Sequence, residues 1–274
     1  MNASVPNVER RYLETRAAFD NVAGQYAGPL GNNRLVQGMR EVLWRTVEKV
    51  APPQARLLDL GCGAGLDAVH FASKGYDVTA IDWSPEMAAE TVRRAGAASA
   101  SGKLTVLNLG IQELDRLGGE PFDCIYSDLG ALNCVAGLDA VATRCASLLK
   151  PGGMLVFSVI GRFCPWELAY YGLRGKLDRA RVRFAREQAP VNLNGGTVWA
   201  RYYDPREFYK TFAAQFVWRE CRALNLFLPP PYLIGAFERH PALFKPLAWL
   251  DKYLGSLPPF NRAGDHFLMV MSRR

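Results

Sequence analysis

The chain has 274 residues, of which 49% are hydrophobic and 22% are charged. This composition predicts a globular protein with a substantial core and excludes intrinsic disorder for the bulk of the chain. The length favours a single domain with insertions over two independent domains. The formal net charge of +7 is compatible with nucleic acid, an anionic membrane surface or an acidic substrate as a partner, and equally with an ordinary, modestly basic enzyme.

We expect neither a signal peptide nor a transmembrane helix. The first residues lack the apolar stretch of a signal peptide, and the longest apolar run, residues 224–237, is interrupted by three prolines. The six cysteines form no Cys-x-x-Cys pair and no histidine lies at zinc-ligand spacing from them, so no metal site is predicted. This pattern favours reduced, mostly buried thiols and a cytoplasmic protein.

Helices and strands alternate over the first 161 residues. Cap helices are predicted within residues 1–50, where apolar residues recur at spacings of three and four over 35–50, after a loop at 27–33. Apolar or β-branched runs predict strands at 56–60, 77–81, 104–107, 123–127 and 154–159. The intervening segments predict helices at about 66–73, 85–95 and 135–149. This alternation is typical of a parallel sheet with helices on both faces.

The pattern changes after residue 161. Residues 174–186 are basic and have the spacing of an amphipathic helix, and a turn is predicted at 194–196. The remaining predicted elements are a helix capped by Asp204, a strand at 215–228, a proline- and aromatic-rich segment at 229–262 and a last strand at 266–272. The predicted basic helix is compatible with a solvated position on the protein surface, with contact to an anionic membrane and with contact to an acidic substrate. Nucleic acid is the least expected partner, because no binding motif accompanies the charge.

The most informative segment joins the first two predicted strands. The first strand ends near Asp59, and Gly61, Gly63 and Gly65 follow at alternate positions before a helix. Glycines allow positive φ and close approach of the backbone to a ligand, and the helix N-terminus offers free N–H groups. Asp82 ends the second strand, where a carboxylate can accept both hydroxyls of a ribose.

These residues favour an adenosine ligand with a cationic tail. A dinucleotide fingerprint, G-x-G-x-x-G, would need glycine where this chain has Leu66. Asp59 would repel a pyrophosphate but attract an ammonium group. Trp83, directly after Asp82, can lie along an adenine ring. A ligand that combines ribose, adenine and a cationic amino-acid tail satisfies both acids, and S-adenosylmethionine is such a ligand.

Five ordered motifs make the sequence resemble the class I S-adenosylmethionine-dependent methyltransferases of the bacterial small-molecule type. They are DLGCGAG at 59–65, AID at 80–82, GIQEL at 110–114, FDCIYSDLGALN at 122–133 and LKPGGML at 149–155. The segment FDNVAGQY at 19–26 resembles the opening of small-molecule members. The resemblance covers roughly residues 15–160, and we expect one methyltransferase domain over 1–274. Its fold would be α/β, a Rossmann-like, doubly wound, seven-stranded sheet whose last strand is antiparallel, with helical substrate-lid insertions at 162–203 and 225–262.

The resemblance also implies which residues hold S-adenosylmethionine. The first strand and the glycine loop would hold its methionine end, the second strand its ribose and the segment at 110–114 its adenine. The end of the fourth strand would lie next to the sulfonium methyl, and N-terminal aromatic residues would help to cover the cofactor. The expected cofactor-binding residues are Tyr26, Arg40, Asp59, Gly61, Cys62, Gly63, Gly65, Asp82, Trp83, Ile111, Gln112, Ser127 and Asp128.

One assignment has an alternative, and one position departs from the family pattern. Arg40 is a candidate for the cofactor carboxylate, and the alternative is that it belongs to a solvated helix face. Family members often carry an acid where this chain has Gly110, so either Gln112 or Glu113 binds the adenine amino group or this contact is missing.

A general base would assist methyl transfer to a hydroxyl of high pKa. The candidates are His240, His266 and Asp128. For His266 the alternative is a structural hydrogen bond to Asp265, and Asp128 could instead orient a loop. Residues Arg162, Cys164 and Trp166 follow the fifth strand at the carboxyl edge of the sheet, where ligands bind, so they are expected to line the acceptor pocket.

Many aromatic residues in the two insertions favour a small, mostly apolar acceptor, with oxygen as the expected methylated atom. The alternatives are a nitrogen or carbon acceptor, or a cofactor-binding protein without methyl transfer. The segment LPPPYL at 228–233 resembles a motif of DNA amino-methyltransferases but comes far too late in the chain, so an ordered loop over the active site is predicted instead. No nucleic acid partner is expected. Contact of 174–186 with a membrane or an acidic ligand, and the oligomeric state, stay open.

Overall fold

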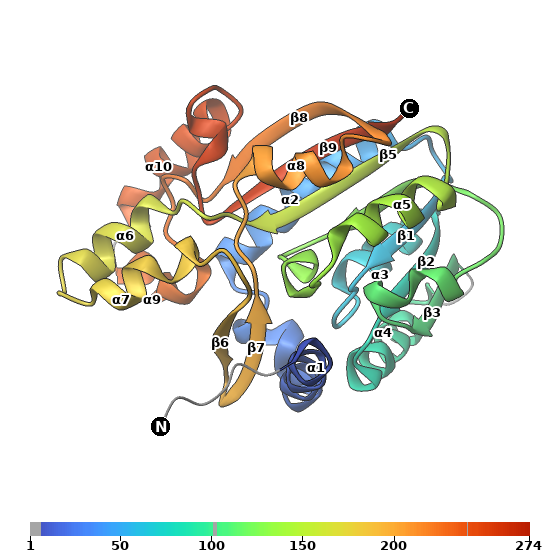
Figure 1. Cartoon of the computed structure of the whole chain (residues 1–274), viewed down its shortest axis with the longest axis horizontal. Helices are drawn as coiled ribbons and strands as arrows, with labels where there is room; N and C mark the ends of the chain where they lie inside the picture. The colour runs from blue at the N-terminus through green and yellow to red at the C-terminus, as the bar shows by residue number, and fades with distance from the viewer. Residues whose placement is uncertain (1–6, 101–102, 240) are drawn as a thin grey trace.

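A seven-stranded sheet forms the centre of the molecule (Figure 1). The computed structural model describes residues 7–100, 103–239 and 241–274. The strand order is β3-β2-β1-β4-β5-β9-β8, and β9 runs antiparallel to both of its neighbours. The strands are β1 (Arg56–Leu60), β2 (Asp77–Asp82), β3 (Leu104–Asn108), β4 (Phe122–Ser127), β5 (Leu149–Ile160), β8 (Phe216–Leu224) and β9 (His266–Arg273). The predicted doubly wound sheet with an antiparallel last strand is confirmed.

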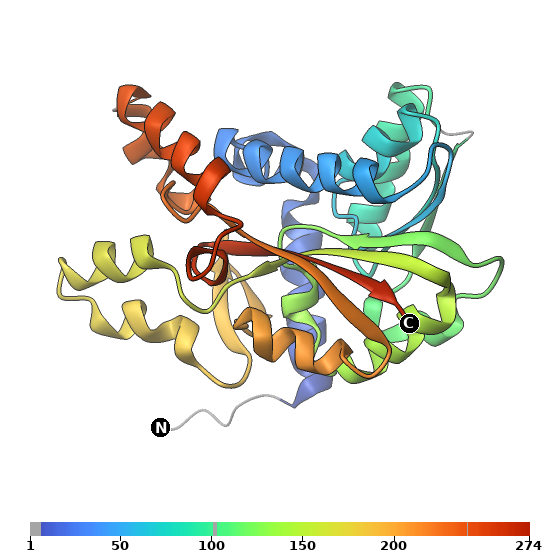
Figure 2. The same cartoon turned by 90° about the horizontal axis from the view of Figure 1, so that it is seen from above.

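Helices cover both faces of this sheet (Figure 2). The helices of one face are α2 (Arg34–Val50), α3 (Leu66–Ser73) and α4 (Pro85–Ala97), and those of the other are α5 (Leu138–Leu148) and α8 (Pro205–Phe212). Neighbouring residues of β5 pack into the cores on opposite faces of the sheet. Val156 packs with the first group of helices, and Phe157 packs with the second. Because both faces are buried, the central strands are apolar without alternation, as the sequence indicates.

Two long helices make up the N-terminal segment. The side chain of Asn7 caps α1 (Val8–Gln25), and the chain continues through a short helical turn, η1 (Tyr26–Leu30). The side chain of Asn33 then accepts two backbone N–H groups of α2, at 3.1 and 3.3 Å, so it starts that helix. The loop predicted at 27–33 is therefore shorter than expected.

The prediction of one helix over 174–186 is wrong in the length of that helix. The helix α7 (Leu177–Arg181) has 5 residues and is followed by a single 3-10 turn, η5 (Val182–Phe184). Gly175, with a φ of +67°, separates it from the preceding α6 (Pro165–Gly172). Arg183 turns into the interior, so the basic residues do not form one continuous helical stripe.

A hairpin of β6 (Ala189–Leu193) and β7 (Gly196–Ala200) follows, which the sequence analysis did not predict. The turn between the strands lies where it was predicted, because Asn194 and Gly195 adopt φ of 48° and 91°, a combination that suits a two-residue hairpin. The hairpin packs on α1, where the backbone N–H of Trp199 donates to the Thr15 hydroxyl at 3.0 Å.

The second insertion lies beside the first at one end of the molecule (Figure 2). Its elements are η6 (Pro231–Leu233), α9 (Ile234–Arg239), α10 (Pro241–Leu254) and η7 (Phe260–Arg262). The carboxylate of Asp251 accepts the N–H groups of residues 226, 227 and 228 and so fixes the loop after β8, which ends at Leu224 rather than at the predicted residue 228. Among the described residues, no helix is both long and apolar enough to cross a bilayer.

Candidate cofactor and acceptor site

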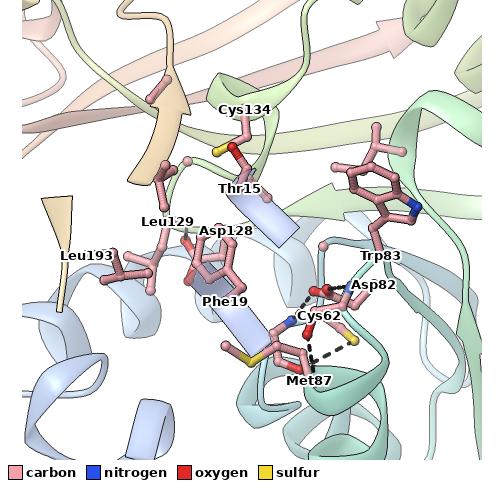
Figure 3. Close-up of a pocket in the computed structure, with 18 of the residues that line it drawn as sticks. Thr15, Phe19, Cys62, Asp82, Trp83, Met87, Asp128, Leu129, Cys134 and Leu193 are labelled. Carbon is pink, nitrogen blue, oxygen red and sulfur yellow. Dashed lines mark hydrogen bonds between the residues drawn. The ribbon is translucent and has the colours of Figure 1, made fainter. Parts of the chain in front are cut away.

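A cavity of about 300 Å³ lies at the carboxyl ends of β1, β2 and β4 (Figure 3). Open α/β sheets bind ligands at this edge. The walls come from the glycine loop after β1, the ends of β2 and β4, η3 (Ile111–Arg116), α1 and the β6–β7 hairpin. The expected cofactor residues found in the lining are Tyr26, Arg40, Gly61, Cys62, Gly63, Asp82, Trp83, Ile111, Gln112 and Asp128.

The glycine loop adopts a backbone conformation that its residues predict. Gly61, Gly63 and Gly65 have φ of +79°, +53° and +77°, which other residues rarely adopt. A Cβ on Gly61 would lie 2.5 Å from the Cβ of Ala131, so the loop packs directly on the segment after β4. A Cβ on Gly65 would lie 2.6 Å from the side chain of Thr91 in α4. Gly65 therefore allows close packing and does not line the cavity, because α4 covers it.

Asp82 holds the loop in place while facing the cavity. Its Oδ2 accepts the N–H of Gly63 at 2.8 Å and its Oδ1 accepts the N–H of Ser84 at 2.9 Å. Burial raises the pKa of this carboxyl to about 6, although the two hydrogen bonds act in the opposite direction. Each carboxylate oxygen has a further lone pair, so ribose hydroxyls can still donate to Asp82. Trp83 lines the cavity beside it and meets the ring of Tyr12 edge-on, with ring centroids 5.6 Å apart.

The side chain of Gln112 fills the space that an acidic side chain at position 110 would occupy. A Cβ on Gly110 would lie 2.3 Å from the Nε2 atom of Gln112, so the glycine makes room for this amide. Glu113 is engaged elsewhere, since one oxygen accepts the N–H of Gly110 at 2.9 Å and the other pairs with Arg116 at 2.7 Å. Gln112 lines the cavity and Glu113 does not. Of the two substitutes expected for the adenine contact, the geometry favours Gln112.

A buried group of charges lines the cavity beside the glycine loop. The Nη1 atom of Arg40 donates to Asp67 and lies 3.8 Å from a carboxylate oxygen of Asp128. The indole N–H of Trp44 donates to Asp67 at 2.7 Å. Burial and the charge of Asp67 raise the pKa of Asp128 to about 6, while Arg40 lowers it. The Nε of Arg40 and the Oδ2 of Asp128 have no hydrogen-bond partner among the described residues. Because buried polar atoms are normally paired, these two atoms indicate a ligand with an anionic and a cationic group.

Asp59 and Ser127 do not line the cavity, unlike the expectation from the sequence. Asp59 is buried, and this burial together with the charge of Asp67 raises its pKa well above the usual value. The hydroxyl of Ser127 donates to the carbonyl of Leu60 at 2.7 Å, so it joins two strands. The acids at the cavity wall are Asp67, Asp82 and Asp128. The sequence analysis missed Asp67, because an acid in the first turn of a helix is equally typical of an ordinary helix N-terminus.

The other end of the cavity is mostly apolar. Figure 3 shows Leu193 of the hairpin and Leu129 of the loop after β4 on the same side of the cavity. The apolar lining of this end consists of Leu129, Val135, Ile160, Val191, Leu193, Val198 and Ala200. Thr15, Asn192 and Tyr202 add polar groups. Of the two insertions expected to form a lid, the first contributes through its hairpin, and the described residues of the second do not line the cavity.

Of the two histidine candidates, the structure describes His266, which does not line this cavity. The Nδ1 atom of His266 pairs with Asp265 at 2.9 Å, and its Nε2 atom is buried without a partner among the described residues. His266 is not part of the lining, although it pairs in register with Ile160 of β5, which is. His240 lies outside the described residues. Asp128 is therefore the catalytic candidate that the structure brings to the cavity.

The residues that follow β5 also lie outside the lining. Arg162 pairs with Glu207 at 2.6 Å, and Cys164 is buried. The indole of Trp166 donates to the carbonyl of Phe227 at 2.7 Å and lines a second, separate groove. The proline-rich loop expected over the site lies against the start of α2 instead, where the carbonyl of Pro231 accepts from the Asn33 side chain at 3.1 Å.

The donor and acceptor groups of the cavity fit S-adenosylmethionine. Asp82 can accept from the ribose, and the amide of Gln112 can pair with the adenine edge. The unpartnered atoms of Arg40 and Asp128 match the carboxylate and the ammonium of an amino-acid end. When bound, this cofactor supplies an electrophilic methyl group on a sulfonium.

Comparisons with known sequences agree with this geometry. Residues 57–153 match the family model described as a methyltransferase domain. A ubiquinone biosynthesis O-methyltransferase of Xanthomonas campestris pv. campestris (strain B100) is 37% identical over 120 residues, which cover 42% of this chain and 46% of that protein. The match thus spans about half the length of that curated relative.

Solved structures share the fold at lower identity. The Burkholderia thailandensis 1,6-didemethyltoxoflavin-N1-methyltransferase, solved with S-adenosylhomocysteine, superposes with a TM-score of 0.57 at 18% identity, covering 100% of this chain and 93% of that one. The [4+2]-cyclase SpnF superposes with a TM-score of 0.59 at 16% identity, covering 97% and 94%. The domain match, the strand order and the glycine-loop geometry agree: residues 57–153 match a methyltransferase domain, and the chain has the fold of S-adenosylmethionine-dependent methyltransferases.

Proposed function

We propose that the protein transfers a methyl group from S-adenosylmethionine to an oxygen atom of a small, mostly apolar acceptor. The observation that carries this proposal is the division of one cavity into two ends. One end holds Asp82, Gln112 and the Arg40–Asp128 pair, and the other is lined by apolar side chains of the hairpin. The name of the matched relative, an O-methyltransferase, supports oxygen as the methylated atom.

The apolar end suits an acceptor that carries few polar groups. Leu129 and Leu193 offer an apolar surface, while the hydroxyls of Thr15 and Tyr202 are available to fix the orientation of a ring or chain. A pocket of this kind draws its affinity from apolar contact and its specificity from a few hydrogen bonds. Alignment and exclusion of water are the main contributions that the protein makes to methyl transfer.

Asp128 is the proposed general base. It lines the cavity after β4. Its Oδ2 atom is available to the cofactor ammonium, and its Oδ1 atom, which accepts the N–H of Leu129 at 2.8 Å, has a further lone pair for an acceptor hydroxyl. With a pKa of about 6, the carboxyl is ionised at neutral pH yet more basic than an ordinary aspartate, which suits it to take a proton from a phenolic hydroxyl. Arg40, at 3.8 Å, keeps the carboxylate in position.

The experiment is a transfer assay with methyl-labelled cofactor and two matched panels of acceptors. One panel contains phenols with apolar substituents, and the other contains the corresponding anilines. We expect label in the phenols, and Asp128→Asn should lower kcat by about a hundredfold or more with a smaller change in acceptor KM. Cofactor affinity, measured by calorimetry, separates loss of the base from loss of binding.

The control variant is Asp139→Asn, which changes an exposed acid in the first turn of α5 and should leave kcat unchanged. Transfer to anilines alone would overturn the oxygen assignment. Cofactor binding without transfer to either panel would overturn the enzymatic proposal, an outcome of interest because a cyclase shares this fold.

We also propose a reducing compartment, the cytoplasm, as the site of action. The six cysteines carry free thiols, and burial raises the pKa of Cys145 and Cys164 to about 12. Thiol counting on denatured protein from cells lysed with a blocking reagent should find all six reduced, and disulfide formation in the cell would contradict this location.

A further inference from the structure

The exposed apolar side chains of the molecule are concentrated in the two insertions. Leu173 is 88% exposed and Trp249 is 58% exposed. The large hydrophobic residues exposed within the insertions are Phe163, Leu173, Leu177, Phe184, Tyr232, Trp249, Tyr253, Leu257 and Phe260. Elsewhere in the described chain, those exposed to this degree are Val8, Leu13 and Val92. Scattered single residues need no explanation, but nine exposed apolar residues within two insertions favour a surface that contacts a partner.

The elements that carry these residues lie together. Figures 1 and 2 both place α6, α7, α9 and α10 at one end of the molecule, opposite the end formed by α4 and β3. We call this end the insertion face and define it by the nine exposed residues of the insertions. A groove of about 810 Å³ is lined by α6 and α10 and by the loop after β8. Its walls include Phe163, Trp166, Phe227, Leu247 and Phe260.

Positive charge predominates next to the insertion face. The exposed basic residues of the segment 173–187 are Arg174, Lys176, Arg179, Arg181 and Arg186, against the exposed acids Asp178 and Glu187. Arg183 does not contribute to this charge, because it is buried and paired with Glu167 and Asp265. Apolar residues at 173, 177 and 184 therefore lie among an excess of exposed cations.

We propose that the insertion face docks on an anionic phospholipid surface. Such a surface offers an apolar layer for Leu173, Leu177 and Phe184 directly beneath a negatively charged layer for the neighbouring arginines. Trp249 and Tyr253 add amphipathic rings, which are typical of the boundary between lipid and water. A polyanion without an apolar layer would leave the exposed leucines in water. The inference rests on the insertions alone and does not depend on the proposed methyl acceptor.

The test uses the full-length protein and large unilamellar vesicles. One set consists of phosphatidylcholine, and the other contains phosphatidylcholine with about a third of phosphatidylglycerol. Co-flotation should show binding to the anionic vesicles at low salt and much weaker binding at high salt. The double variant Arg179→Glu/Arg181→Glu should lower the vesicle partition coefficient by about twentyfold or more, and Leu173→Ser/Leu177→Ser by about tenfold.

Two control variants match these changes outside the insertion face. Arg45→Glu/Lys49→Glu reverses the same number of charges on exposed side chains of α2, and Val92→Ser removes an apolar side chain of α4 that is 57% exposed. Both should bind vesicles like the parent protein. Thermal melting and cofactor titration establish that every variant is folded, since none of these residues lines the cofactor cavity.

Three outcomes would overturn the proposal. They are absence of binding to anionic vesicles, equal loss of binding in the control variants, and a stable dimer in sedimentation analysis that Leu173→Ser/Leu177→Ser converts to monomer while vesicle binding is unchanged. The last result would assign the insertion face to a second copy of the chain.

Discussion

Two buried arginines, one in each half of the molecule, show how the two regions differ. Arg183, in the first insertion, donates to Glu167, to the carbonyls of Gly161 and Asp265 at 2.9 Å, and to the Asp265 carboxylate at 2.6 Å. Arg40, beside the cofactor cavity, donates to Asp67 but has an Nε atom without a partner among the described residues. Both guanidinium groups are buried and both face two acids.

The difference lies in how completely the buried charges are satisfied. A buried ion pair whose nitrogen atoms all donate hydrogen bonds fixes chain segments to one another, and Arg183 fixes the insertion to the ends of β5 and β9 in this way. A buried charge with an unused donor at a cavity wall is suited to a charged ligand. The insertion network is therefore structural, and the Arg40 network belongs to the binding site.

The variant with the largest expected effect tests the structural network. Arg183→Met leaves Glu167 and Asp265 buried without their counter-charge, so the free energy of unfolding should fall by about 3–5 kcal/mol. Denaturant unfolding measures this loss, and cofactor affinity should be unchanged in the folded protein. The exposed Arg179→Met is the matched control and should change stability by less than about 0.5 kcal/mol. Equal losses in both variants would remove the distinction.

Substitutions in the glycine loop have the next largest expected effect on the free energy of unfolding. Gly65→Ala should lower the free energy of unfolding by about 2–4 kcal/mol, because a Cβ there would collide with Thr91 in addition to the strain of positive φ. Gly63 also has positive φ, but its Cβ would lie 3.6 Å from the Tyr26 ring, which is ordinary contact. Gly63→Ala should therefore cost only about 1–2 kcal/mol. Similar losses in the two variants would contradict this account.

Asp82→Ala tests the nucleoside end of the cavity. Loss of hydrogen bonds to a charged group should weaken cofactor binding by about a hundredfold, measured by calorimetry. Asp77→Ala changes an exposed acid at the other end of the same strand and should leave cofactor affinity unchanged. Full affinity of Asp82→Ala would remove the ribose contact from the proposal.

The pH dependence of cofactor affinity has the smallest expected effect for each titrating group. Burial raises the pKa of Asp82 and of Asp128 to about 6, whereas ribose hydroxyls and an ammonium favour the ionised carboxylates. Below pH 6 a proton must leave before the ligand binds, so affinity should rise about tenfold for each group between pH 5 and pH 7 and level off above. Calorimetry in two buffers should also detect proton release near pH 6. An affinity independent of pH would contradict the raised pKa values.

The sequence by itself determined the doubly wound sheet and much of the nucleoside end of the site. Strand ends, helix caps and glycines in the loop are properties of neighbouring residues, so the contact of Asp82 with Gly63 follows from a pattern that spans one strand and one loop. The sheet topology follows from the alternation of helices and strands for the same reason.

The tertiary structure alone decided which charges pair and which walls close the cavity. Arg40 meets Asp67 across 27 positions, and Thr15 meets Trp199 across 184. No local pattern specifies such contacts, because they depend on how whole helices and hairpins pack. For the same reason the sequence offers Asp59 as a cofactor contact and His266 as a general base, yet packing buries both of them outside the cavity lining, while Asp128 remains at its wall.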